Sequence, residues 1–197
     1  MLSAAGISLT GAMMPGPLTA AVIAKGYGDR NAGAWVAVGH GIIELPLIAA
    51  IYVGFGHFFS SPQVVSVIGI VGGLMLFYLG FQMFRTAGRA PGEVSGLPRN
   101  PIIAGIMTTG ANPYFFIWWA TLGMALIVGA AEFGLIGILL FALVHWCCDL
   151  AWDQFLSWVT FKSRHWWTQK VQRVVFSICA LILIGFGVWF FVSAFFQ

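Results

Sequence analysis

Two histidine–acid pairs stand inside long apolar stretches of the sequence. His40 precedes Glu44 by four residues, and His145 precedes Asp149 by four, with Asp153 four residues further on. Side chains four residues apart share one face of a helix, so these residues predict two polar stripes. An ionisable group at the centre of a membrane helix costs about 2.5–3.5 kcal/mol on insertion scales, and such groups therefore indicate binding sites or ion pathways.

These side chains support three kinds of chemistry. Glu44 and Asp149 would hold the cationic group of a substrate. His40 and His145 would exchange protons near neutral pH, and with Asp153 and the other acids they also offer nitrogen and oxygen ligands for a transition metal. The structural alternative is that the pairs hydrogen-bond and only hold helices together. For Asp153, nearer the basic end of its helix, the alternative is solvation.

Prolines interrupt two other apolar stretches at similar positions. Residues 10–17 read Thr-Gly-Ala-Met-Met-Pro-Gly-Pro, and residues 109–113 read Thr-Gly-Ala-Asn-Pro. Proline removes a backbone N–H and breaks a helix, which exposes half-helix ends whose partial charges suit the carboxylate and ammonium groups of a zwitterion. Paired interruptions of this kind indicate a transporter binding site, although packing kinks are the alternative. The residues expected to bind substrate here are Pro15, Gly16, Pro17, Thr19, Asn112 and Pro113.

The composition identifies the elements that carry these residues. Of 197 residues, 60% are hydrophobic and 8% are charged, and the mean hydropathy is +0.93. Soluble domains carry about 25% charged residues, so a soluble, disordered or nucleic-acid-binding protein is excluded. We expect an all-α, polytopic membrane protein. Six charge-poor stretches predict six membrane helices, near residues 2–24, 32–55, 63–84, 101–129, 133–160 and 173–196.

The distribution of basic residues predicts the orientation of these helices. All nine Lys and Arg residues fall in the first, third and fifth connections, whereas Glu132 is the only charge in the second and fourth. Cytoplasmic loops are enriched in Lys and Arg. We therefore expect a multi-pass protein of the cytoplasmic membrane, with both termini outside.

The two halves of the chain resemble each other weakly. Each half has an interrupted helix followed by a helix with a histidine–acid pair. With three helices in each, the second half would insert upside down relative to the first. We expect one transmembrane domain over residues 1–197, built from inverted repeats of about residues 1–90 and 100–197, with helices one and four broken at proline. No phosphate-binding loop of the GxxxxGK[ST] type is present, so we expect no ATP-driven mechanism within the chain.

Several of these residues also form family motifs. Pro-Gly-Pro at 15–17, followed by Gly33 and Gly39, and Ala-Asn-Pro at 111–113 resemble motifs of the lysine-exporter (LysE/RhtB) family of amino-acid translocators. The resemblance covers the whole chain. It implies export of an amino acid or a related small metabolite, powered by an ion gradient or by exchange, and it allows a homodimer. The aromatic run at 114–119 departs from the family pattern; we expect Trp118 and Trp119 within it to serve packing.

The leading hypothesis is thus a secondary exporter of an amino acid or a related zwitterion. The alternative is a divalent metal cation exporter that uses the histidine–acid stripes. An intramembrane enzyme is less favoured, because no GxSxG or HExxH motif accompanies the stripes. We expect no enzymatic activity and no cofactor. The expected partners are a small substrate and the lipid bilayer. Gly69 and Gly73 form a GxxxG step, which suits close helix contact or dimerisation.

Overall fold

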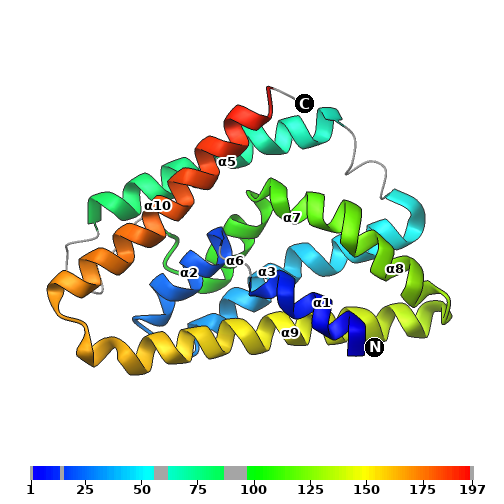
Figure 1. Ribbon diagram of the computed structural model, residues 1–197, viewed down its shortest axis with the longest axis horizontal. Helices are drawn as coiled ribbons and strands as arrows, with labels where there is room; N and C mark the ends of the chain where they lie inside the picture. The colour runs from blue at the N-terminus through cyan, green and yellow to red at the C-terminus, as the bar shows by residue number, and fades with distance from the viewer. Residues whose placement is uncertain (1, 14–15, 56–61, 87–96, 196–197) are drawn as a thin grey trace.

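The structure is a computed structural model that describes residues 2–13, 16–55, 62–86 and 97–195, where all regular structure is helical (Figure 1). The first half holds α1 (Leu2–Ala12), α2 (Pro17–Gly26), α3 (Ala32–Ala50), the π-helical turn η1 (Ile51–Phe55) and α5 (Pro62–Thr86). The second half holds α6 (Pro101–Gly110), α7 (Pro113–Trp118), the π-helical turn η2 (Trp119–Gly123), α8 (Met124–Ala131), α9 (Gly134–Ser163), the short η3 (Arg164–Trp166) and α10 (Gln169–Ser193).

Among the described residues, four helices are long and apolar enough to cross a membrane. They cover Ala32–Gly54, Pro62–Arg85, Gly134–Trp166 and Gln169–Ser193, and they agree with the second, third, fifth and sixth predicted spans. The other two predicted spans are each divided into shorter helices. This is the architecture of a polytopic membrane protein.

The two interruptions lie where the prolines predicted them. Between α1 and α2, Gly16 is extended (φ −164°, ψ −167°), and Pro17 occupies the first position of α2. Between α6 and α7, Asn112 is extended (φ −101°, ψ 98°), and Pro113 begins α7. Proline fits a first helical position because its missing N–H has no intrahelical partner there. Pro15 lies outside the described residues.

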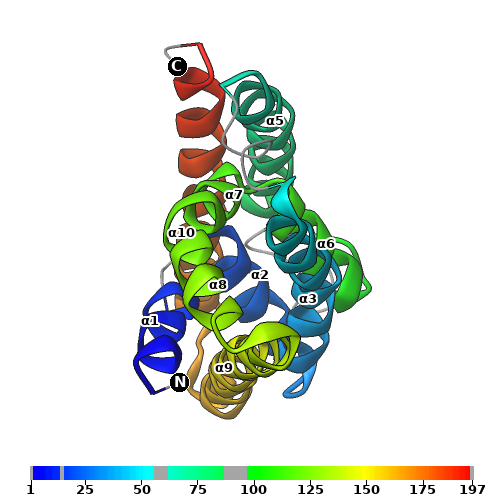
Figure 2. The same cartoon turned by 90° about the vertical axis from the view of Figure 1, so that its right-hand side faces the viewer.

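The helices form two groups that meet at the interrupted segments. α5 packs along α10 on one side, and α9 runs along the opposite side, as Figures 1 and 2 both show. Between them, α3 packs against α6 and α9, while α1 and α2 pack against α9. The second interrupted segment contacts α5 through α7, and the first contacts α10 through α2. The interrupted segments therefore lie in the interior of the assembly.

Glycines allow α3 to approach its neighbours at backbone distance. A Cβ atom placed on Gly33 would lie 2.0 Å from the carbonyl oxygen of Asp153 in α9, and one on Gly39 would lie 2.1 Å from that of Ile102 in α6. Across the same contact, a Cβ atom on Gly105 would lie 2.2 Å from the carbonyl oxygen of Val36. Small residues at helix contacts are characteristic of membrane bundles, and here they fix the position of α3.

The GxxxG step of α5 is used within the chain. A Cβ atom on Gly69 would lie 3.0 Å from Cβ of Ala194, and one on Gly73 would lie 2.7 Å from the carbonyl oxygen of Gly187. Both neighbours lie at α10 or its C-terminal end. The close helix contact that the sequence predicted is thus intramolecular, and this step supplies no face for a dimer.

The described parts of the three basic connections lie at the same end of the molecule. Arg164 Nη1 donates a hydrogen bond to the carbonyl oxygen of Tyr27 at 3.2 Å, and Gln154 Nε2 donates to that of Arg30 at 2.9 Å. These contacts join the fifth connection, and the end of α9 before it, to the first. Leu97, in the third connection, packs against the apolar cluster that includes Tyr27. The clustering of cations agrees with the charge asymmetry of the sequence.

Replacing Gly39 with Ala is expected to lower the free energy of unfolding by about 1–3 kcal/mol, because the added methyl group would overlap the α6 backbone. The matched control is Gly129→Ala in α8, where a Cβ atom would meet nothing within 4 Å. That variant should gain up to about 1 kcal/mol from helix propensity. Thermal unfolding of the purified variants in detergent measures both effects. Equal melting temperatures for the two variants would contradict the close contact.

Candidate functional site

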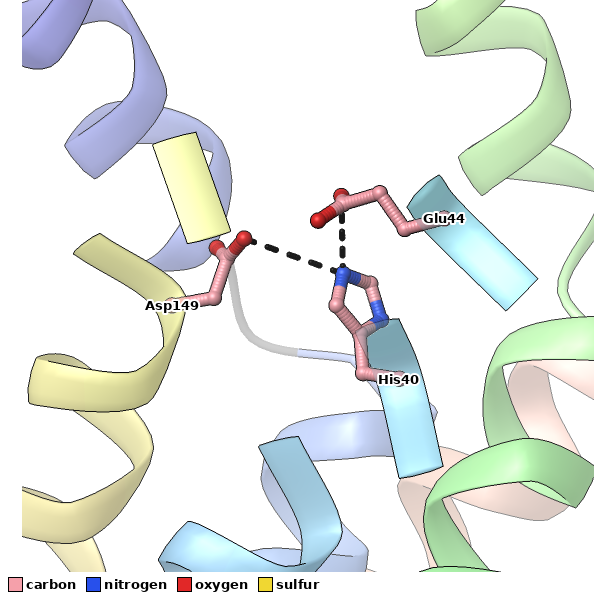
Figure 3. Close-up of side chains that lie close together, drawn as sticks. All are labelled: His40, Glu44 and Asp149. Atoms are coloured by element: carbon pink, nitrogen blue, oxygen red, sulfur yellow. Dashed lines mark hydrogen bonds and ion pairs between the residues drawn. The ribbon is translucent and has the colours of Figure 1, made fainter. Parts of the chain in front are cut away.

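Four buried ionisable side chains meet where α3 crosses α9, and three of them, His40, Glu44 and Asp149, are drawn in Figure 3. Glu44 Oε1 lies 2.9 Å from His40 Nε2 and 3.2 Å from His145 Nε2. Asp149 Oδ2 lies 3.8 Å from His40 Nε2 and 3.6 Å from His145 Nε2. The two stripes expected from the sequence therefore form one unit. We call His40, Glu44, His145 and Asp149 the His–acid cluster.

Hydroxyl groups from the interrupted helices position both imidazoles. Thr109 Oγ1, near the end of α6, lies 2.9 Å from His40 Nδ1, and Ser8 Oγ, in α1, lies 2.7 Å from His145 Nδ1. Each histidine is thus held by a helix from the other half of the chain. Sequence reasoning missed both hydroxyls as site residues, and only the position of Thr109 beside the predicted break could have indicated it.

Within this cluster and beside it lie buried carboxylate oxygens that lack a hydrogen-bond partner among the described residues. Glu44 is 1% exposed, Asp149 5% and Asp153 3%, and Glu44 Oε2, Asp149 Oδ2 and Asp153 Oδ2 find no hydrogen-bond partner in the described part of the chain. Solvation of Asp153 is therefore wrong as an interpretation, because Gly33 lets α3 cover this part of α9. Leaving buried carboxylate oxygens without a partner costs free energy, which indicates that this site binds a ligand.

A cavity of about 130 Å³ opens beside the His–acid cluster. It brings together nine of the residues that the sequence singled out: Gly16, Pro17, Thr19, His40, Glu44, Asn112, His145, Asp149 and Asp153. Pro113 is buried at the start of α7 and is not part of the lining. The sequence thus placed most of its candidates around a single cavity, from segments far apart in the chain.

Aromatic rings form the other wall of the cavity. Phe115 lies edge-on to His40 with ring centroids 5.3 Å apart, and the rings of Trp118 and Trp119 lie 5.6 Å and 4.9 Å from that of His145. Trp119 is 1% exposed and packs in the core as expected, but both tryptophans also line the cavity. The signal for this wall was the aromatic run after Pro113.

The two interruptions offer different helix ends to the cavity. In α7 the side chain of Asn112 accepts a hydrogen bond from the N–H of Tyr114 at 3.1 Å and caps the helix. In α2 the N-cap residue is Gly16, which has no side chain to accept a hydrogen bond from the first turn. A helix N-terminus carries partial positive charge and exposed N–H groups, which suit an anionic group. The α2 end is therefore the better placed of the two for a carboxylate.

An all-helical membrane bundle with a polar cavity at broken helices is an architecture found among membrane transporters. A family profile described as LysE type translocator matches residues 9–194, and the chain belongs to this family. The members of this family are membrane transporters rather than enzymes, so membrane transport is the general function of the chain. Comparison with curated proteins and with solved structures finds no match.

The hydroxyl on His40 gives a test of the site geometry. Thr109→Val should lower the free energy of unfolding by about 1–3 kcal/mol, because it leaves a buried imidazole nitrogen without its partner. Thr108→Val is the matched control: Thr108 is also fully buried, but its hydroxyl bonds only to backbone carbonyls of its own helix. Thermal unfolding in detergent compares the two. A Thr108→Val effect as large as that of Thr109→Val would contradict the assigned role.

Proposed function

We propose that the protein is a secondary exporter of an amino acid or a closely related small zwitterion. The observation that carries this proposal is the pairing of opposite charges across one cavity. The N-terminus of α2, whose N-cap Gly16 carries no side chain, borders the cavity, and the buried carboxylates of Glu44 and Asp149 border it from α3 and α9. A substrate carboxylate would meet the helix end, and its ammonium group would meet the acids.

The same cluster supplies a means of coupling transport to an ion gradient. His40 and His145 both contact Glu44, so a proton gained or lost by an imidazole changes the charge that faces the substrate. The sequence carries no phosphate-binding loop, which favours an ion gradient or exchange as the energy source.

The helix contacts support an inverted-repeat arrangement of three helices in each half. In the first half α1 packs on α9, and in the second half α6 packs on α3; likewise α2 packs on α10, and α7 on α5. Two further pairs, α3 with α9 and α5 with α10, join corresponding helices of the two halves and would lie on the axis that relates them. The crosswise hydroxyl contacts of Ser8 and Thr109 follow the same relation. We propose repeats of residues 1–90 and 100–197.

The basic end of the molecule would face the cytoplasm, with both termini outside the cell membrane. In a variant whose native cysteines are replaced by Ala, new cysteines at Glu132 and at His165 report the two ends. A membrane-impermeant maleimide added to intact cells should label Glu132→Cys, whereas His165→Cys should react only after permeabilisation. The reverse pattern would overturn the orientation.

Export is tested by efflux from proteoliposomes loaded with labelled cationic, neutral or acidic amino acids. We expect saturable efflux that one of these classes competes. Glu44→Gln and Asp149→Asn should each reduce that efflux at least tenfold, because each removes a charge opposite the ammonium group. Glu132→Gln, at an exposed position between α8 and α9, is the matched control and should keep wild-type efflux. Unchanged efflux in both cavity variants would show that the site is misassigned.

The same assay tests the role of the N-terminus of α2 by comparing an amino acid with its decarboxylated amine. For the amino acid that is transported best, the decarboxylated amine keeps the ammonium group and the side chain but loses the carboxylate. The amine should compete at least tenfold more weakly, because nothing then occupies the helix N-terminus. Equal competition by the amine would remove the helix end from the site and leave only the acids.

A further inference from the structure

The His–acid cluster carries the donor atoms of a metal site. A nitrogen of His40, a carboxylate oxygen of Glu44 and one of Asp149 lie within 4.8 Å of one another, and all three residues are buried (Figure 3). His145 Nε2 lies beside the same two carboxylates and is placed to supply a fourth ligand. Two imidazoles and two carboxylates are a set that first-row transition metals accept.

The spacing of these atoms fits a small four-coordinate ion. Zinc bonds of about 2.0–2.2 Å to nitrogen and oxygen in a tetrahedral site place neighbouring ligand atoms about 3.3 Å apart. The four nitrogen–oxygen separations in the cluster are 2.9, 3.2, 3.6 and 3.8 Å. They lie on both sides of that value, so the nitrogen–oxygen spacing is compatible with a four-coordinate ion.

The outer contacts of the imidazoles are those of metal ligands. A metal-bound histidine donates its other ring N–H to an outer oxygen, which fixes its orientation. Here the Nδ1 atoms of His40 and His145 lie against the hydroxyl oxygens of Thr109 and Ser8. With a metal ion bound, Nδ1–H would donate to these hydroxyls and both Nε2 atoms would present lone pairs to the ion.

The charges and unpaired atoms of the cluster also call for a cation. Glu44 Oε2 and Asp149 Oδ2 are buried and have no hydrogen-bond partner among the described residues. A divalent cation balances two carboxylates while both imidazoles remain neutral. One ion would therefore satisfy Asp149 Oδ2 and both Nε2 atoms at once, and it would bind Glu44 through one of its two oxygens.

We propose that His40, Glu44, His145 and Asp149 bind a divalent transition-metal ion of the Zn²⁺ type. The imidazoles favour such an ion over Mg²⁺ and Ca²⁺, which prefer oxygen ligands alone. The inference rests on the proposed function only in placing the ion on the transport path. There the ion and the ammonium group of an amino acid would use the same carboxylates.

Equilibrium binding of radiolabelled Zn²⁺ to the purified full-length protein, with no histidine tag, tests the proposal without any transport assay. We expect one saturable site per chain that a hundredfold excess of Mg²⁺ or Ca²⁺ does not occupy. His145→Gln and Asp149→Asn should each weaken binding at least tenfold. Thr109→Val should weaken it about tenfold through the orientation of His40. His165→Gln, at an exposed histidine outside the cluster, is the matched control and should bind as the wild type does.

Two further measurements keep the test decisive if a cluster variant is unstable. Zn²⁺ should raise the melting temperature of the wild-type protein, since binding only to the folded state stabilises it. Co²⁺ bound in place of Zn²⁺ should show the intense visible bands of a four-coordinate site. No stoichiometric Zn²⁺ binding, or binding that His165→Gln weakens as much as Asp149→Asn, would overturn the proposal. Zn²⁺ binding without amino-acid efflux would support the metal site and contradict the proposed substrate.

Discussion

The bundle depends on the absence of side chains where α3 meets its neighbours. Helix axes usually lie about 8–10 Å apart, and larger contact residues increase the distance. Gly33 brings the backbone of α3 against α9, while Gly39 and Gly105 bring α3 and α6 together. This approach lets Glu44 on α3 reach His145 on α9 at 3.2 Å. A side chain at Gly33 would push α3 away from α9 and weaken the contact between Glu44 and His145.

The interrupted helices complete the site that forms where α3 crosses α9. A continuous helix would satisfy its own backbone groups and present no end at membrane depth. Ending α6 at Gly110 and starting α2 at Pro17 instead places helix ends and polar side chains beside the cluster. The same segments hold the imidazoles through Ser8 and Thr109, so the breaks shape the cavity and also orient its bases. The same few contacts thus determine both the packing of the helices and the geometry of the site.

Local sequence patterns predict much of this arrangement. The prolines at 17 and 113 predicted the breaks, and the four-residue spacing predicted both polar stripes, because these features depend on a helix alone. The union of the stripes into one cluster, the hydroxyl contacts of Ser8 and Thr109, and the burial of Asp153 depend on which helices cross. Glycine positions hint at crossings, but several glycines face open space, and a sequence pattern does not name the partner helix.

The acids of the two histidine–acid pairs differ by one methylene group. Glu44, the longer, reaches both imidazoles at 2.9 and 3.2 Å, whereas the shorter Asp149 stays 3.6 and 3.8 Å from them. The two carboxylates are therefore placed unequally about the imidazoles, although the two pairs come from similar positions in the two halves. A symmetric ligand with two identical ends would therefore meet different surroundings at each end and would bind in one orientation. The difference in side-chain length alone thus makes the two sides of the cavity electrostatically unequal.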